Sequence, residues 1–144
     1  MKKLITTYLF TLIIAAMVTL EVHAQSTENR SVGSFHGLKS SQGISVYLHK
    51  GTTPSVKIEA ENIDMDDIRT EVQGGILKIS LSGGNHRNVN VKVDVTFVTL
   101  DMIAASSASG VFSSDLIQGS DLEVMAASAA TIELNVDVQQ LKLN

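Results

Sequence analysis

The stretch Ala104–Gly110, AASSASG, decides the fold because a similar stretch occurs again later in the chain. A run of similarly small residues, AASAAT, occupies Ala126–Thr131. With the flanking apolar residues included, 103–111 matches 124–132, so that Ser107 falls on Ser128. A repeat of about this period predicts β-coils that stack on one another.

Stacking explains why the repeated residues are small. Successive coils lie roughly 4.8 Å apart, so a residue at a tight corner meets its own equivalent in the next coil. Alanine, serine and glycine fit there because their side chains are short. Serine hydroxyls can also pair with backbone groups that a corner leaves without partners.

A further segment continues the repeat. LKLN (141–144) resembles LEVM (122–125), at a slightly shorter spacing. A period that drifts in this way is typical of stacked coils. A short helix or a flexible linker remain alternatives for the small-residue runs, although serine and glycine are weak helix formers and apolar strand residues flank both runs.

Period-two alternation predicts half-buried strands in most of the remaining chain. Inward positions are apolar and outward positions are polar in four segments: ISVYLH (44–49), VKIEA (56–60), LKISL (77–81) and VNVKVDVTF (89–97). Glycine-containing turns separate these segments, since glycine tolerates positive φ. The segment 61–72 fits a short helical turn or a wide loop equally well. The expected class is therefore all-β.

The N-terminal segment predicts an export signal. Lys2 and Lys3 precede an apolar run from Leu4 to Leu20, and Val22-His23-Ala24 fits a cleavage site before Gln25. The alternative is a membrane anchor, because the apolar run approaches the length of a membrane-spanning helix. We expect residues 1–24 to be a signal peptide, 25–34 a flexible mature N-terminus, and 35–144 the β-domain.

Composition narrows the function further. The chain has a formal net charge of −4, which does not attract phosphate backbones, so we expect no nucleic-acid partner. It contains no cysteine, so an exported domain would depend on its own core without disulfides. The aromatic residues available for a carbohydrate site in 25–144 are Phe35, Tyr47, Phe97 and Phe112.

Three segments in order give the chain a family resemblance: FHGLKSSQGISVYLHKG (35–51), VKIEAENIDMDDIRTEVQGGILKISL (56–81) and VNVKVDVTFVTLDMIAASSASGV (89–111). Together with the N-terminal signal, they resemble the head GIN domain family of putative auto-transporter adhesins. The resemblance implies a single-stranded, right-handed parallel β-helix-like solenoid in the periplasm, on the outer-membrane surface or outside the cell. It implies no established activity.

Two departures from the family pattern matter. Alanines replace many residues of the Gly-Ser-Gly repeats, and family members usually continue with further coils where this chain stops at Asn144. A final coil would expose an unpaired edge with Leu141 and Leu143. We therefore expect the solenoid to be truncated and incomplete at its C-terminal end; the alternative is an edge that a partner chain covers by self-association.

No catalytic motif is present, so we predict a non-enzymatic protein. His36, His49 and His86 are widely spaced and are expected at the surface. The one candidate metal site is an acidic loop with six carboxylates, which could hold Ca²⁺: Glu59, Glu61, Asp64, Asp66, Asp67 and Glu71. The competing interpretation is a solvated loop whose charge discourages edge pairing; we otherwise predict no cofactor.

The leading hypothesis is an adhesin-like binding or structural module that presents its β-surface to a glycan or an envelope protein. One alternative is a carbohydrate-active enzyme or a calcium-dependent glycan-binding module on the same scaffold. A second alternative is a self-assembling structural subunit. After signal cleavage no membrane span is expected.

Overall fold

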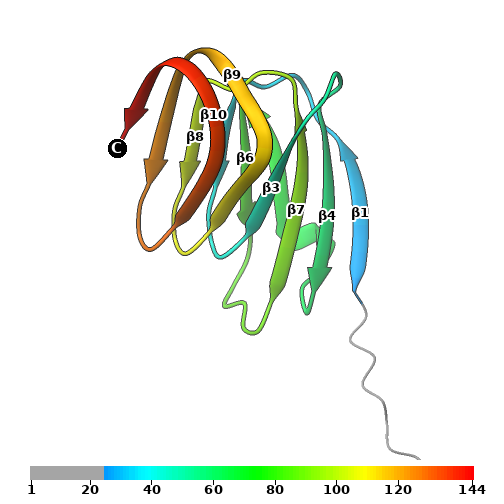
Figure 1. Ribbon diagram of the computed structural model, residues 1–144. Helices are drawn as coiled ribbons and strands as arrows, with labels where there is room; N and C mark the ends of the chain where they lie inside the picture. The colour runs from blue at the N-terminus through cyan, green and yellow to red at the C-terminus, as the bar shows by residue number, and fades with distance from the viewer. Residues whose placement is uncertain (1–24) are drawn as a thin grey trace, which may run out of the picture.

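The computed structural model describes residues 25–144, and the predicted signal peptide lies outside them. These residues form a ten-stranded sheet that curls into an open half-barrel (Figure 1). The strands are β1 (Ser26–Ser31), β2 (Gly37–Ser40), β3 (Ser45–Lys50), β4 (Ser55–Glu61), β5 (Ile68–Gln73), β6 (Ile76–Leu81), β7 (Asn90–Phe97), β8 (Met102–Ala105), β9 (Gly110–Ala126) and β10 (Thr131–Leu143). One short 3-10 helix, η1 (Met65–Asp67), precedes β5.

The sheet has two facing halves that the long strand β9 joins. One half runs in the order β1-β4-β7-β3-β9, and the other runs β9-β8-β2-β6-β5. The N-terminal part of β9 pairs with β3 and its C-terminal part pairs with β8, so a single strand passes through both halves. β10 pairs with β9 along the whole bend.

The core lies between the two halves and is almost entirely aliphatic. The alternating residues predicted to face inward are buried in β3, β4, β6 and β7; for example, Val46, Ile58, Ile79 and Val93 are at most 1% exposed. Phe97 is the largest fully buried side chain. The all-β class and the four alternating strands are therefore confirmed.

The repeat also predicts the strand register. Ile103 pairs with Val124 and Ala105 with Ala126, which is the alignment that the two small-residue runs give in the sequence. Thr131 pairs with Gly110 at the same offset, and a bulge in β9 then shortens the offset so that Leu141 pairs with Leu122. Both offsets seen in the sequence are thus spacings between neighbouring parallel strands.

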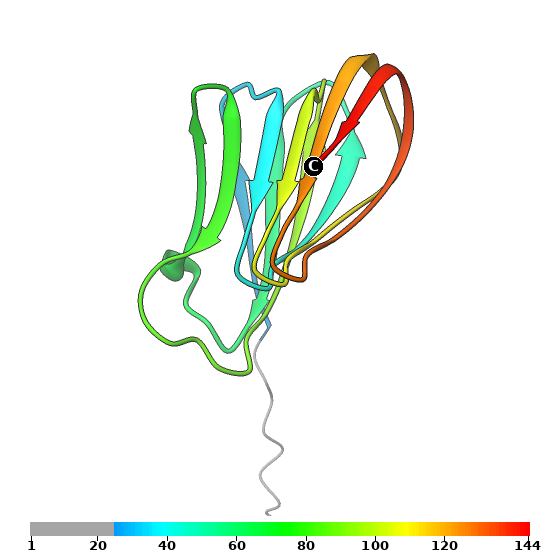
Figure 2. The same ribbon diagram turned by 90° about the vertical axis from the view of Figure 1, so that its left-hand side faces the viewer.

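The small-residue runs form turns that stack on one another, not helices or linkers. Ser107–Ala108 and Ser128–Ala129 all have positive φ, between 51° and 62°. The equivalent turn at Gln42–Gly43 also has positive φ, 63° and 70°. The amide of Gly43 donates to the carbonyl of Ser107, and that of Ala108 donates to the carbonyl of Ser128, each over 2.9 Å. Figure 2 shows the three turns nested at one edge of the molecule.

A serine hydroxyl completes the polar pairing inside this corner, as the repeat suggests. Ser109 is 1% exposed, and its Oγ donates to the carbonyl of Ser40 over 3.0 Å. The same oxygen accepts from the amide of Ser106. The stack requires small residues because the turns lie close together. The left-handed backbone is a second reason for small residues, since bulky or β-branched residues avoid that conformation, and the sequence alone does not reveal it.

Three of the nine strand pairings are antiparallel, whereas the expected parallel β-solenoid would contain only parallel pairings. They are β1 with β4, β4 with β7, and β5 with β6. The parallel stacking is confined to β2, β3, β6, β7, β8, β9 and β10. A parallel β-helix through the whole domain is therefore not established, and what the structure has is a mixed, curled sheet.

Two segments differ from expectation near the antiparallel end. Residues 26–31, expected within a flexible N-terminus, form β1, and Arg30 explains why. Its guanidinium donates to the carbonyls of Met65 and Ile68 and to Thr70 Oγ1, which ties β1 to the opposite half of the sheet. In the ambiguous segment 61–72, a 3-10 turn is present, but residues from Ile68 onward form a strand because they pair with β6.

Candidate functional site: an aromatic groove on the outer face

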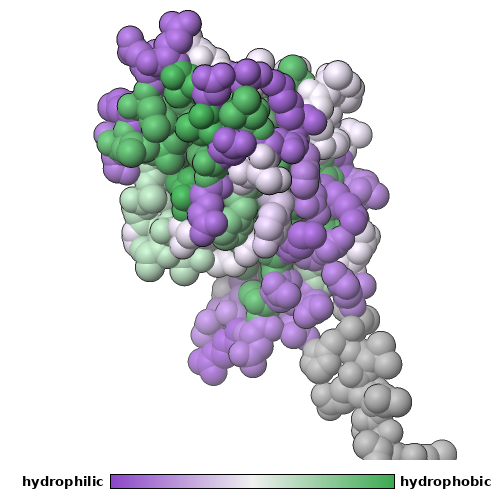
Figure 3. All heavy atoms as spheres, in the orientation of Figure 1, coloured by the Kyte–Doolittle hydropathy of each residue, from purple (hydrophilic) through white to green (hydrophobic). Residues whose placement is uncertain are grey.

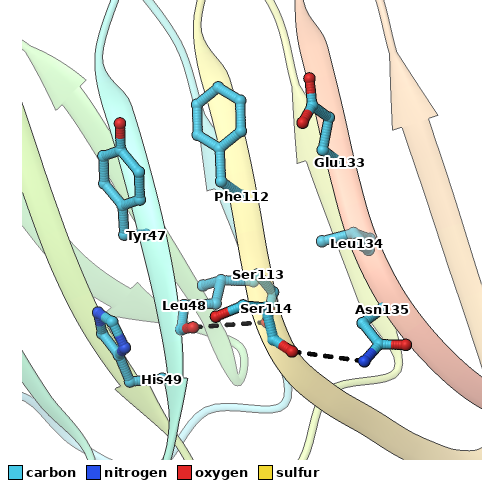
Figure 4. Close-up of a pocket in the computed structure, with 9 residues that line it drawn as sticks. All are labelled: Tyr47, Leu48, His49, Phe112, Ser113, Ser114, Glu133, Leu134 and Asn135. Carbon is cyan, nitrogen blue, oxygen red and sulfur yellow. Dashed lines mark hydrogen bonds between the residues drawn. The ribbon is translucent and has the colours of Figure 1, made fainter.

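The candidate site begins with three outward positions that strand register brings side by side. Tyr47 on β3 pairs with Phe112 on β9, and Phe112 pairs with Glu133 on β10. Because paired residues of parallel strands point to the same side of the sheet, all three side chains stand on the outer face. Figure 4 shows them as a row above His49 and Asn135.

The two aromatic rings stack on each other. Their centroids are 5.3 Å apart and their planes differ by 27°. Lys92 Nζ lies 5.3 Å from the centroid of the Tyr47 ring, within cation–π range. Gly110 leaves room for the Phe112 ring, since a Cβ at that position would lie 2.6 Å from the ring carbon Cε2. Tyr47 nevertheless remains 37% exposed.

Polar groups border the rings and define a shallow groove with a volume of about 500 Å³. Besides the row of three, its lining comprises Leu48, His49, Ser113, Ser114, Leu134 and Asn135. Ser113 Oγ lies 2.9 Å from the carbonyl of Asp115 and 3.4 Å from that of Leu48. Asn135 Nδ2 donates to the carbonyl of Ser114 over 3.4 Å. The groove thus combines a flat apolar wall with hydroxyl, amide, imidazole and carboxylate groups.

An ion-pair ladder flanks the groove on β4 and β7. His49 Nε2 lies 3.1 Å from Asp94 Oδ1, and Lys92 Nζ lies 3.4 Å from Asp94 Oδ2. Burial by itself raises the pKa of Asp94, but its hydrogen bonds with His49 and Lys92 and their charges outweigh burial and lower it. The carboxylate of Asp94 therefore stays ionised and holds both side chains beside Tyr47.

Glu59, one of the six acidic-loop candidates, belongs to this ladder. Its hydrogen bond and ion pair with Lys57, together with the charge of Lys92, lower the pKa of Glu59. The same hydrogen bond with Glu59 raises the pKa of Lys57. Glu59 therefore lies in β4 next to two cations rather than in a cation-binding loop.

The other five carboxylates of the acidic loop are spread over several elements. Glu61 ends β4, Asp64 and the η1 residues Asp66 and Asp67 follow, and Glu71 lies in β5. Glu71 accepts from Gln73 Nε2 and lies 3.9 Å from Arg69. Within residues 25–144 no three histidine, cysteine or carboxylate side chains gather closely enough to hold a metal ion.

The three histidines each have a separate polar partner. His36 Nδ1 lies 2.8 Å from Asp101 Oδ1, and its ring packs against Gly75. His86 Nε2 lies 2.9 Å from the carbonyl of Ser82. Of the three, His49 alone lies in the groove.

Tyr47 and Phe112 stand out in the sequence as available aromatic residues, but no local pattern places them together. The signal that could have done so is a second, longer repeat: GISVY at 43–47 resembles ASGVF at 108–112. Both segments leave a left-handed turn and place an aromatic residue directly after an inward valine. The two copies lie far apart in the sequence, because the strands from β4 to β8 come between them. A repeat with such wide spacing is easily missed.

Comparison with known proteins gives the following. Residues 34–144 match the family model described as putative auto-transporter adhesin, head GIN domain. Among curated proteins, none matches the chain. No helix in the described part of the chain has the length and hydropathy needed to cross a membrane.

Several solved structures share the fold. A putative adhesin from Parabacteroides merdae has a TM-score of 0.77 and 20% identity, and the match covers 85% of this chain and 53% of that one. A putative adhesin from Bacteroides fragilis has a TM-score of 0.62 at 18% identity, over 84% and 56% of the two chains. A putative lipid binding protein from Parabacteroides distasonis has a TM-score of 0.65 at 14% identity, over 85% and 63%. The chain thus spans between half and two thirds of these structures.

Proposed function

The chain belongs to the head GIN domain family of putative auto-transporter adhesins, and from that premise we propose that it is an exported, non-enzymatic binding module that holds a carbohydrate in the aromatic groove. The observation that carries the proposal is the stack of exposed Tyr47 on half-buried Phe112, beside Glu133 on the outer face of the sheet. An adhesive role is consistent with the family, and export is consistent with the signal peptide predicted at residues 1–24.

The chemistry of the groove matches that of a sugar ring. One face of a pyranose presents C–H groups, which pack against an aromatic surface, while its rim presents hydroxyls that both donate and accept hydrogen bonds. The rings of Tyr47 and Phe112 supply the apolar surface. The carboxylate of Glu133 and the amide of Asn135 line the same groove and can pair with the hydroxyls.

The sheet keeps this surface ready for a ligand. Tyr47 is held between Phe112 and Lys92, and Lys92 is itself held by Glu59 and Asp94. Side chains that are already ordered lose little conformational entropy on binding, which favours affinity. The groove is open rather than enclosed, which suits the capture of a polymer chain better than water-excluding catalysis.

A glycan array probed with the full chain tests the proposal. We expect binding to a subset of neutral or amino-sugar glycans, and Phe112→Ala or Tyr47→Ala should weaken it about tenfold, which corresponds to about 1.4 kcal/mol of aromatic contact. Val98→Ala is the matched control because Val98 is exposed outside the groove lining. Chelation of divalent cations should leave binding unchanged.

Two results would contradict the proposal. A folded protein that binds no glycan on the array would remove the carbohydrate partner. Equal loss of binding in Val98→Ala and Phe112→Ala would show that the groove is not the contact surface.

A further inference from the structure

The other half of the sheet carries a second groove on its outer face, separate from the aromatic groove. β6, β2, β8 and the C-terminal arm of β9 lie side by side there (Figure 2). The groove has a volume of about 350 Å³, and small-molecule sites typically have volumes of roughly 300–1,000 Å³. Two lysines, Lys39 and Lys78, line it, and none of the described residues in its lining is acidic.

The two lysines stand next to each other. Lys39 on β2 pairs directly with Lys78 on β6, so both side chains leave the sheet on the same side, from backbones roughly 4.8 Å apart. Both side chains are exposed. Like charges placed directly across a strand pair destabilise a sheet. The pair therefore costs stability, and it occurs in a chain whose formal net charge is −4.

Carboxylates do not neutralise these lysines. All the ion pairs found within residues 25–144 involve other cations. Lys78 Nζ donates instead to the amide oxygen of Gln73 over 2.8 Å. Glu71 on β5 opposes Lys78, but its carboxylate accepts from Gln73 Nε2 and lies 3.9 Å from Arg69. The ammonium groups are therefore available to an external anion.

Lysines on the first half of the sheet have carboxylate neighbours. Lys57 forms an ion pair with Glu59, and Lys92 lies between Glu59 and Asp94. Hydrophilic side chains predominate on the part of the surface where β4 and β7 lie (Figure 3), and these ion pairs balance the charges there. Charge balance within the protein does not explain the pair on β2 and β6 in the same way.

A row of serines continues the groove beside the lysines. Backbone hydrogen bonds from the amides of Ser41 and Ser106 extend the parallel pairing beyond β2 and β8. Ser80 on β6 therefore lies abreast of these two serines, and all three line the groove on the side to which the lysines point. Hydroxyl groups donate and accept hydrogen bonds, so the row suits the hydroxyls of a sugar. Ala104, which pairs with Lys39, is short and leaves room for one.

We propose that this second groove binds an acidic sugar residue, whose carboxylate or sulfate lies between the amines of Lys39 and Lys78 and whose hydroxyls pair with the serine row. Ammonium groups form charge-assisted hydrogen bonds with such an oxyanion, which also offsets the repulsion between the two lysines. A surface of anionic lipids suits the site less well, because it repels a chain of net charge −4. The inference does not rest on the aromatic groove.

Heteronuclear NMR of the full chain titrated with glucuronate tests the proposal. We expect saturable shifts of the backbone amides that line the second groove, and no such shifts with glucose at the same concentrations. Lys39→Gln and Lys78→Gln should each weaken glucuronate binding about fivefold. Lys50→Gln is the matched control, because Lys50 is an exposed lysine outside the lining of both grooves. It should bind glucuronate as the parent does.

Two results of this titration would overturn the proposal: the absence of saturable shifts in the groove, and an equal loss of affinity in Lys50→Gln. Glucose 6-sulfate identifies the source of the anion, since the tighter of the two sugar acids shows whether the site takes a sulfate or a carboxylate. Inorganic sulfate that binds as tightly as either sugar acid would overturn the proposal. Vesicles of phosphatidylglycerol that shift these amides when the sugar acids do not would overturn it as well.

The serine row has its own test. Ser106→Ala removes one hydroxyl and should weaken glucuronate binding about threefold, while the affinity for inorganic sulfate stays the same, because the hydroxyl contacts the sugar and not the anion. An unchanged affinity for glucuronate would contradict the proposal. Tyr47→Ala should leave the shifts in this groove unchanged, so a failure of the aromatic groove to bind glycans is distinguishable from a failure of this site.

The lysine pair also predicts opposite effects on stability and on binding. Lys39→Gln removes the repulsion and should raise the melting temperature of the unliganded protein slightly, although it weakens glucuronate binding. Thermal unfolding followed by circular dichroism measures the change. A lower melting temperature in Lys39→Gln would show that Lys39 stabilises the fold, and it would contradict the assignment of the pair to a ligand.

Discussion

The two ends of the sheet are built in different ways. At the end that contains β8, β9 and β10, the strands run parallel, and the sequence of 103–111 recurs in similar form at 124–132. At the other end, β1, β4 and β7, and likewise β5 and β6, run antiparallel, and glycine-containing turns and side-chain contacts such as those of Arg30 join them. Parallel stacking leaves a visible repeat because equivalent positions share one environment, whereas antiparallel pairing leaves only alternation.

Substitutions in the core should have the largest effect on stability at either end of the sheet. Ile58 lies in β4 at the antiparallel end and Ile103 in β8 at the parallel end, and both are fully buried in one cluster. Ile58→Ala and Ile103→Ala should each lower the free energy of unfolding by about 3 kcal/mol, because each leaves a cavity. Urea unfolding with fluorescence-independent detection, such as far-UV circular dichroism, measures the effect.

The same experiment asks whether the ends fold as one unit. A shared core predicts a single transition with an unchanged denaturant slope in both variants. A second transition that appears in Ile103→Ala alone would mean that the parallel end unfolds separately, and the one-core description would be wrong.

The next largest effect concerns the stacked turns, where equivalent positions carry different residues. Gly43 and Ala108 occupy matching places in two turns, and both have positive φ, 70° and 59°. Gly43→Ala should destabilise the protein by about 1 kcal/mol through backbone strain, since no atom lies near the added Cβ. Ala108→Gly should stabilise it by up to about 1 kcal/mol, because strain relief exceeds the added chain entropy.

Gly84→Ala is the control for this pair, because Gly84 has no positive φ and no atom within reach of an added Cβ. It should change the melting temperature little. Destabilisation by Ala108→Gly would show that the methyl group packs in the stack and that its contacts outweigh the backbone strain.

The smallest effect concerns Asp94, which lies on β7 where the two kinds of pairing meet, antiparallel to β4 and parallel to β3. Despite burial, the hydrogen bonds and charges of His49 and Lys92 lower the pKa of Asp94 in the folded state. A carboxyl with a lowered folded pKa stabilises the protein above its unfolded pKa, near 4, and this contribution is lost as the pH falls through the folded value.

Asp94→Asn should therefore cost less than about 1 kcal/mol at neutral pH and nothing at an acidic pH below the lowered folded pKa of Asp94. Urea unfolding curves of the variant and the parent at both pH values measure the difference. A cost that is the same at both pH values would mean that Asp94 acts through its shape and not through its charge.

Several features were predictable from the sequence because each depends on local chemistry repeated along the chain. Alternation identifies β3, β4, β6 and β7 because a strand with one buried face must be apolar at every second residue. The recurring AASSASG-like run locates two corners and the register between them. The shorter spacing at Leu141 even reflects the bulge in β9, which moves the register of β10 from that point on.

Other features were not predictable, because they depend on contacts between distant segments. β1 is a polar strand whose order comes from pairing with β4 and from the contacts of Arg30 with Met65, Ile68 and Thr70, which lie far away along the chain. β5 is a strand because β6 pairs with it, although its own sequence also suits a turn. The acidic loop looks like one cluster in the sequence, but its members divide among β4, the connecting residue Asp64, η1 and β5.

The sequence by itself determined an all-β domain with an aliphatic core, stacked small-residue corners and the spacing between the last rungs. Those properties follow from side-chain size and from a period of two, which every strand with one buried face shows whatever its neighbours are. Only the tertiary structure decided that antiparallel strands flank the stack, and that Tyr47 and Phe112 stand side by side with Glu133 in one groove. Which side chains lie side by side across a sheet depends on which strands pair, and strand pairing depends on contacts throughout the curled sheet.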